Sequence, residues 1–247
     1  MSTVKVNPKG KKALVSGANR GIGKAITIEL LEQGATVYAG ARNTASLNDL
    51  KTHYGEKLIP LQLDVTDKDS IKTAVAKIDD LDILINNAGV LSFGTIFSDN
   101  SSETLKQHLD VNVWGLIELS NALIKHLKKE SETAIINISS LAGLGNMPVI
   151  GTYSVSKAAV HSITQGMRAE LSKNNALVIG VYPGPIDTEM TTEMDMEKDS
   201  PQNVAKSIIQ GLKNGTEDIY PDAMSIQIGP FYASNPKAVE QQFASFA

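Results

Sequence analysis

Short apolar runs without polar alternation recur along this chain, and stretches with helical spacing of apolar residues separate them. Such runs are typical of strands buried on both faces of a parallel sheet. They predict strands at 13–16, 36–41, 59–65, 82–86, 134–139 and 177–182. Apolar residues three or four positions apart predict helices at 22–32, 46–53, 69–78, 103–127, 153–171 and 203–212. The alternation predicts an α/β fold, a doubly wound parallel sheet with helices on both faces.

Neither a linker rich in Pro, Gly or Ser nor an internal repeat interrupts this pattern in the 247 residues. We therefore expect one domain over 1–247. The end of the chain is less regular, with a last strand predicted to start at 219–220 and a closing helix at 236–246. Met190, Met194 and Met196 alternate with acidic residues, which predicts a short lid at about 189–200; the alternative is a surface helix whose methionines fill gaps in the packing.

Composition excludes several classes of function. The chain has 23 Lys and Arg against 27 Asp and Glu, a net charge of −4, and no basic block, so nucleic acid is not expected as a partner. Cysteine is absent, which excludes disulfides and thiolate chemistry, and the four histidines form no ligand pattern, so no metal is expected. Nowhere do 18 apolar residues run together, so we expect no membrane span and a cytoplasmic protein.

Three glycines follow the first predicted strand and lead directly into the first helix. The segment reads Ser16-Gly17-Ala18-Asn19-Arg20-Gly21-Ile22-Gly23. Glycines allow a tight turn and a close backbone approach, while the free N–H groups at a helix N-terminus attract a pyrophosphate. We expect a dinucleotide to bind here; the alternative is a turn whose glycines serve packing alone.

The end of the second predicted strand indicates which dinucleotide. An acidic residue there would bind the ribose hydroxyls of NAD, but this strand ends in Ala41-Arg42. Arg20 and Arg42 both fall where the 2′-phosphate of NADP would lie, and the planar guanidinium suits phosphate. NADP(H) is therefore expected in preference to NAD, unless both arginines are merely surface cations.

Further motifs follow along the chain. They are Asn86-Asn87-Ala88-Gly89, Asn112, Ser139-Ser140, Tyr153 with Lys157, and Pro183-Gly184-Pro185-Ile186-Asp187-Thr188. In order and spacing these motifs are similar to the short-chain dehydrogenase/reductase family over about residues 11–190, which implies a Rossmann fold and hydride transfer between a nicotinamide and a small-molecule carbonyl or alcohol.

Tyr153 and Lys157 stand four residues apart on a predicted helix, so they share one face. At about 5 Å and an effective dielectric constant near 20, the ammonium would stabilise a phenolate by roughly 3 kcal/mol. That would bring the pKa of the phenol from about 10 toward neutrality, so we expect Tyr153 to act as general acid and base. The alternative is a packed tyrosine beside a lysine whose ammonium reaches solvent.

The resemblance assigns the other catalytic roles. The serine 13 residues before the tyrosine, Ser140, polarises the substrate oxygen, while Ser139 supports the strand end or the cofactor. Asn112 holds a helix kink and a water that links Lys157 to solvent.

The resemblance also implies the cofactor contacts. Asp64 and Val65 would contact adenine, although Asp64 is as readily interpreted as the cap of the following helix. Ile186 and Thr188 would hold the nicotinamide amide. The full set is Gly17, Asn19, Arg20, Gly21, Ile22, Gly23, Arg42, Asp64, Val65, Asn87, Ala88, Gly89, Tyr153, Lys157, Pro183, Gly184, Ile186 and Thr188.

The residues expected to line the substrate pocket are mostly apolar, which favours an apolar carbonyl compound. They are Leu91, Phe93, Leu141, Met147, Ile150, Pro185, Met190 and Met194. The segment 219–224 departs from the family's usual C-terminal turn, which argues against a tetramer by that route. Helices 103–127 and 153–171 could instead pair in a homodimer.

Three alternatives share parts of this pattern. Nucleotide-sugar epimerases need a larger C-terminal region than the roughly sixty residues after Pro183. Non-enzymatic NADP sensors typically lose the tyrosine. Enoyl reductases place it six residues before the lysine, not four. A carbonyl reductase fits best.

Overall fold

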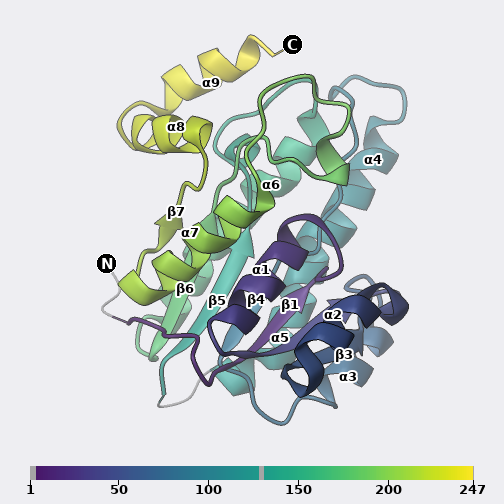
Figure 1. Ribbon diagram of the computed structural model, residues 1–247. Coiled ribbons are helices and arrows are strands. Elements are labelled where there is room, and N and C mark those ends of the chain that lie inside the picture. Colours follow the sequence, from purple (N-terminus) through teal and green to yellow (C-terminus); the bar gives the residue numbers. More distant parts are fainter. Residues whose placement is uncertain (1–3, 128–130, 247) are drawn as a thin grey trace.

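A seven-stranded parallel sheet forms the centre of the protein (Figure 1). The computed structural model describes residues 4–127 and 131–246. Within them the strand order is β3-β2-β1-β4-β5-β6-β7. The strands are β1 (Lys12–Ser16), β2 (Thr36–Ala41), β3 (Leu58–Gln62), β4 (Ile83–Asn86), β5 (Thr133–Ile138), β6 (Ala176–Val181) and β7 (Asp218–Ile219).

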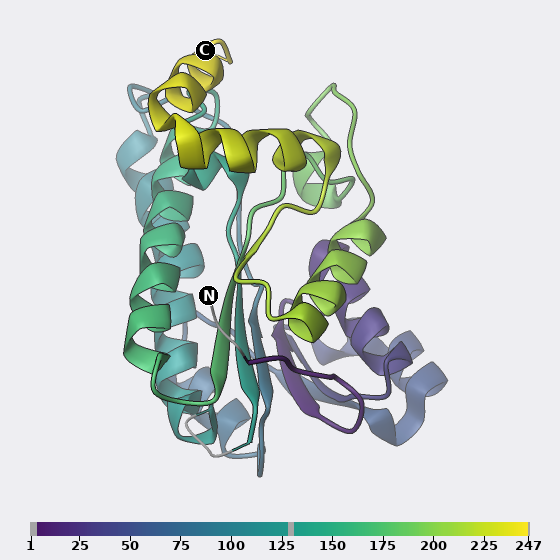
Figure 2. The same cartoon turned by 90° about the vertical axis from the view of Figure 1, so that its left-hand side faces the viewer.

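Helices cover both faces of this sheet (Figure 2). One apolar cluster joins it to α1 (Gly21–Glu32), α2 (Asn48–Tyr54) and α7 (Pro201–Asn214). A second joins it to α3 (Lys68–Val75), α5 (Gly115–Leu127) and α6 (Gly151–Leu171). This confirms the expected fold class. Within 4–127 and 131–246 no helix is long and apolar enough to cross a bilayer.

The central strands are apolar on both sides because successive side chains enter different clusters. Val15 and Ile85 belong to the cluster with α1, whereas Leu14 and Leu84 belong to the cluster with α5. Side chains alternate between the faces of a strand, so a strand covered on both faces cannot show polar alternation.

The predicted helix 103–127 is interrupted. The chain forms α4 (Ser101–His108), a π-helical turn (Leu109–Trp114) and then α5. Asn112 lies in this turn, and its side chain bonds Val90 and Ser156 outside the helix. Such π-bulges often occur at functional sites, and the kink agrees with the one that the resemblance implied.

Other predicted boundaries shift by a few residues. The third strand ends at Gln62, not at 65, because Asp64 turns the chain by accepting hydrogen bonds from the Thr66 amide and hydroxyl. The helix predicted at 46–53 is split into a 3-10 turn and α2, and α3 ends three residues early. The short 3-10 turns are η1 (Thr44–Leu47), η2 (Gly55–Lys57), η4 (Leu141–Gly143) and η5 (Glu189–Thr191).

Two helices after β7 lie beyond the carboxyl end of the sheet (Figures 1 and 2). The second, α9 (Pro236–Ala244), corresponds to the predicted closing helix. The first, α8 (Ala223–Ser234), was not predicted. It contains Pro230, and apolar residues lie on both its buried and its exposed sides, so it has no clear helical period. Asp222 caps it by accepting from the Ser225 amide.

The turn from β1 into α1 depends on its glycines. Gly17 and Gly21 have φ of +66° and +50°, values that favour glycine. A Cβ on Gly23 would lie 2.1 Å from the Gly17 carbonyl oxygen and 2.3 Å from Asn87 Nδ2. This glycine therefore lets α1 start against the strand end.

We expect Gly23→Ala to lower the free energy of unfolding by about 2 kcal/mol or more, because the methyl group must displace backbone. Gly166→Ala in α6 is the matched control, since a Cβ there meets nothing within 4 Å. It should raise stability by about 0.5–1 kcal/mol. Urea unfolding of both variants measures this, and equal effects would contradict the packing role of Gly23.

Candidate active site

One cavity of about 420 Å³ opens at the carboxyl ends of the strands. Ligands of open α/β sheets bind where neighbouring strands connect in opposite directions, here between β1 and β4. Every residue that the sequence predicted for cofactor and substrate lines this cavity, as does Ser140. Asn112 is the exception, since it lies buried behind the wall. Residues not predicted include Ala41, Leu63, Thr66, Val90, Gln107, Val111, Ile138, Val149, Met224 and Phe246, while Glu189, Thr191 and Met196 come from the predicted lid.

Ser16 and Asn87 join the ends of β1 and β4. The Ser16 hydroxyl accepts from the amides of Asn87 and Ala88, each at 3.0 Å, and donates to the Ile85 carbonyl. Asn87 Nδ2 donates to the Ser16 carbonyl at 2.9 Å and to that of Gly17 at 3.2 Å. These bonds fix the distance between the glycine turn and the cavity floor.

The glycine turn fits a pyrophosphate. The first turn of α1 carries no acidic residue. Arg20 is the N-cap residue, and within the part of the chain that the structure describes its side chain makes no capping hydrogen bond to the helix amides. The first-turn amides and the positive end of the helix dipole thus border the cavity. A Cβ on Gly21 would lie 3.2 Å from Thr188 Cγ2, so the two segments form a narrow channel that glycine keeps open.

Both arginines expected at the 2′-phosphate line the cavity. Arg20 Nη1 lies 2.6 Å from Glu189 Oε2, and both side chains are exposed. Arg42 lies near enough to Asp64 for its charge to help lower the pKa of that carboxyl group, after the larger effect of the hydrogen bonds from Thr66. Each cation therefore already faces one carboxylate.

Asp64 does not cap the next helix, so that alternative is wrong. Asp67 is the N-cap of α3, and its carboxylate accepts from the amides of Asp69 and Ser70. Asp64 lies three residues too early and instead holds the turn at Thr66, on the cavity wall.

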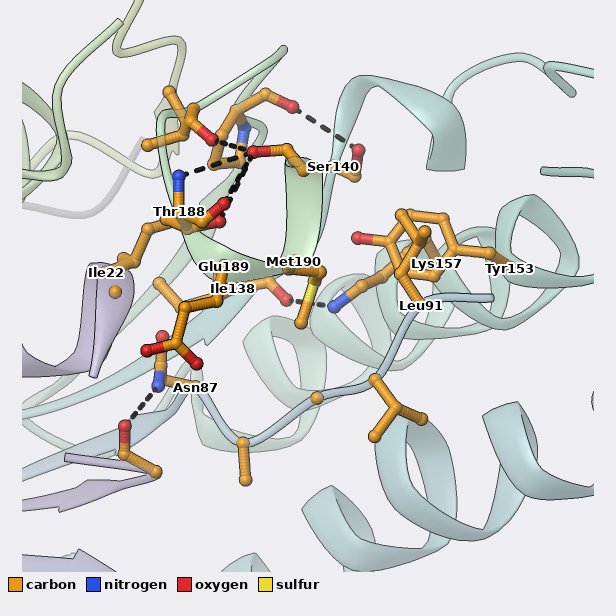
Figure 3. A pocket seen from close by; sticks show the side chains of 18 of the residues that line it. Ile22, Asn87, Leu91, Ile138, Ser140, Tyr153, Lys157, Thr188, Glu189 and Met190 are labelled. Atoms are coloured by element: carbon orange, nitrogen blue, oxygen red, sulfur yellow. Dashed lines mark hydrogen bonds between the residues drawn. The ribbon is translucent and has the colours of Figure 1, made fainter. Parts of the chain in front are cut away.

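Tyr153 and Lys157 share one face of α6 as expected, with Lys157 Nζ 5.6 Å from the centre of the tyrosine ring. The expected fall in the pKa of Tyr153 is not what the structure gives. Burial raises the pKa of the phenol, and the hydrogen bond with Ser140 opposes this only in part. Lys157 points toward Ile138 and donates to its carbonyl at 2.8 Å (Figure 3). Burial also lowers the pKa of Lys157 to about 8, which weakens its effect as a cation.

The two serines differ as the sequence suggested. Ser139 Oγ donates to the Lys157 carbonyl at 3.1 Å, while its amide continues the ladder to Val181. Ser140 begins η4, accepts from the Ala142 amide, and interacts with the Tyr153 hydroxyl. Ser140 is thus the serine that can reach an oxygen beside the tyrosine.

Asn112 does not line the cavity but bonds a residue that does, Val90. Its Oδ1 accepts from the Val90 amide at 2.8 Å, and its Nδ2 donates to the Val90 carbonyl and to Ser156 Oγ. A Cβ on Gly89 would lie 3.2 Å from Asn112 Oδ1 and 3.8 Å from Lys157 Nζ. Gly89 therefore lies close to both of these polar side chains.

The far end of the cavity is apolar. Met224 and Phe246, from α8 and the segment after α9, line it beside the predicted pocket residues. The segment predicted as a lid is closed at its base by one parallel bridge between Ile186 and Asp199. Because the C-terminal helices reach the cavity only through tertiary packing, no local signal could identify their residues.

Comparison with known proteins places the chain among relatives of one kind. A family model described as short chain dehydrogenase matches residues 11–199. An uncharacterized oxidoreductase of Staphylococcus epidermidis is 33% identical over 211 residues, 83% of this chain and 91% of that protein. A similar oxidoreductase of Staphylococcus aureus is 34% identical over 212 residues, with 82% and 90% covered.

A solved structure agrees along nearly the whole chain. It is a short chain dehydrogenase from Burkholderia cenocepacia in complex with NADP. The TM-score is 0.89 at 32% sequence identity, with 97% of this chain and 99% of the other covered.

The burial of Lys157 yields a stability prediction. Lys157→Met should be more stable than the wild type at pH 7 by about 2 kcal/mol, because roughly 3 kcal/mol of charge burial outweighs about 1 kcal/mol for the bond to Ile138. Between pH 8 and about 10.5 the unfolded lysine keeps its proton while the folded one loses it. Wild-type stability then rises with pH, and the gap should close.

Urea unfolding at several pH values from 7 to 10 measures this gap. Lys24→Met, at an exposed lysine of α1, is the control and should show no such trend. A gap for Lys157→Met that does not change with pH would contradict the prediction.

Proposed function

Because this chain belongs to the short-chain dehydrogenase family, and is thus a nicotinamide-dependent oxidoreductase of the CH–OH/C=O class, we propose that it is an NADPH-dependent carbonyl reductase with Tyr153 as general acid and base. The observation that supports this most strongly is the meeting of Tyr153, Ser140 and Lys157 in one cavity. The glycine turn and a set of apolar side chains line the same cavity.

The proposed chemistry uses the side chains in the states that the structure favours. A bound NADPH would supply a hydride to the carbonyl carbon. Tyr153, with its raised pKa, is a neutral phenol at pH 7 and can donate its proton to the carbonyl oxygen. The Ser140 hydroxyl, which donates to the Pro183 carbonyl at 3.3 Å in the structure, would turn to donate a hydrogen bond to the same oxygen and stabilise the charge that develops there.

Lys157 has two tasks in this proposal. Its ammonium lies close enough to the Tyr153 ring to favour the phenolate left after proton donation. With a pKa of about 8 it also exchanges protons readily near neutral pH. Asn112, which lies near Gly89 as Lys157 does, would hold the water that returns the proton.

The preference for NADP(H) is part of the proposal. Arg20 and Arg42 border the cavity at the turn after β1 and at the end of β2, and β2 offers no terminal acid for the ribose. The Burkholderia cenocepacia relative was solved with NADP. The other residues proposed for the cofactor keep the roles that the resemblance implied.

The substrate end favours an apolar carbonyl compound. Leu91, Phe93, Met147 and Met190 line the same cavity as Tyr153. The segment 189–200 is proposed as a lid over this end. We further propose a homodimer through the helices α5 and α6.

Tyr153→Phe tests the acid–base role. Turnover of a ketone with NADPH should fall by about 10²- to 10⁴-fold, because the proton donor is lost, while NADPH binding should stay within twofold. Steady-state kinetics and cofactor-fluorescence titration measure the two effects. Turnover close to the wild type would contradict the proposed mechanism.

Arg20→Gln and Arg42→Gln test the cofactor preference. Each should weaken NADPH binding about tenfold and leave NADH binding unchanged, because only NADPH carries the 2′-phosphate that a guanidinium bonds. Lys24→Gln serves as control, since Lys24 is an exposed cation of α1 outside the cavity. Equal losses for both cofactors would show that the arginines do not distinguish them.

A further inference from the structure

His108 is a buried histidine that borders the active site without lining the cavity. It is the last residue of α4, and its side chain is fully buried. Its Nε2 lies 3.0 Å from the Ser92 amide nitrogen and its Nδ1 lies 3.1 Å from Thr152 Oγ1. The ring thus bridges the loop after β4 and the start of α6.

These contacts set the protonation of the ring. A backbone amide can only donate, so Nε2 must accept from Ser92. In the neutral ring the proton then lies on Nδ1 and is donated to the Thr152 hydroxyl. Burial, assisted by the charge of Lys157, lowers the pKa of His108, so the neutral form is the one that the fold favours.

Each end of this bridge is next to a residue of the site. Ser92 lies between Leu91 and Phe93, which form part of the apolar wall. Thr152 directly precedes Tyr153, and the His108 ring meets the Tyr153 ring edge-on, with centroids 5.8 Å apart and planes at 75°. His108 is therefore the side chain that contacts both the substrate wall and the catalytic tyrosine's segment.

The other attachments of this loop lie on either side of Ser92. Asn112 holds the backbone of Val90 through two hydrogen bonds. Gly94 bonds the backbone of Val149 and Gly151. His108 bonds Ser92, midway between these attachments. Without this bond, Leu91 and Phe93 would be held only through Val90 and Gly94.

We propose that His108 is a positioning residue that fixes the distance between the apolar substrate wall and the Tyr153 hydroxyl through its two hydrogen bonds. The proposal rests on the proposed function, because it assigns the wall to the substrate and Tyr153 to proton transfer. It predicts that the two bonds serve different kinetic parameters. The bond to Ser92 governs substrate binding, and the bond to Thr152 governs the chemical step.

Three variants separate the bonds. His108→Gln can keep an acceptor near the position of Nε2, and His108→Asn can keep a donor near that of Nδ1, while His108→Leu removes both. With an aryl ketone and saturating NADPH, His108→Asn should raise KM about tenfold with kcat within threefold, and His108→Gln should lower kcat about tenfold with KM within threefold. His108→Leu should show both losses. His53→Leu, at an exposed histidine of α2, is the control and should show neither.

A second measurement does not depend on turnover. Hydrogen exchange of the segment 88–96 should be at least tenfold faster in His108→Leu than in the wild type, and His108→Gln should exchange as slowly as the wild type. If the wild type reduces no ketone, the proposed function fails, and this measurement still decides whether His108 holds the loop. Unchanged exchange in His108→Leu, or identical kinetic losses in His108→Asn, His108→Gln and His108→Leu, would overturn the proposal.

Discussion

The hydrogen bonds between Ser16 and Asn87 are the constraint on which the rest of the site depends. They join β1 and β4 where the connections of the sheet leave toward opposite faces, so the crevice there has a fixed width. Gly23 brings α1 against one side of it, and the loop after β4 follows from the other. The helix amides, the tyrosine and the apolar wall keep their distances because this junction is rigid.

Burial determines the chemistry of the site as much as geometry does. Desolvation shifts the pKa of Tyr153 upward and those of Lys157 and His108 downward, so all three groups are driven toward their neutral forms. An apolar pocket provides this environment. The same burial of ionisable groups lowers the free energy of unfolding, so the environment that suits activity reduces stability.

Patterns that depend on neighbours in sequence were predictable, and those that depend on tertiary packing were not. Strands buried on both faces and the glycine turn carry local signals, so the sheet and the cofactor end could be predicted. The helix α8 lacks a readable period, and Met224 enters the cavity only because α8 folds back. The four-residue spacing correctly placed Lys157 beside Tyr153, but no spacing reveals how far water is excluded, so the direction of the pKa shift was missed.

The single parallel bridge between Ile186 and Asp199 has an evolutionary consequence. It closes the segment between them into a loop whose two ends are already paired. The free energy of closing such a loop grows only by about 0.6 kcal/mol for each doubling of its length. Residues 192–198 can therefore be lengthened, shortened or exchanged while the strand ends stay in register. A loop of different length here would change the wall that Met194 and Met196 contribute to the cavity without moving the strands.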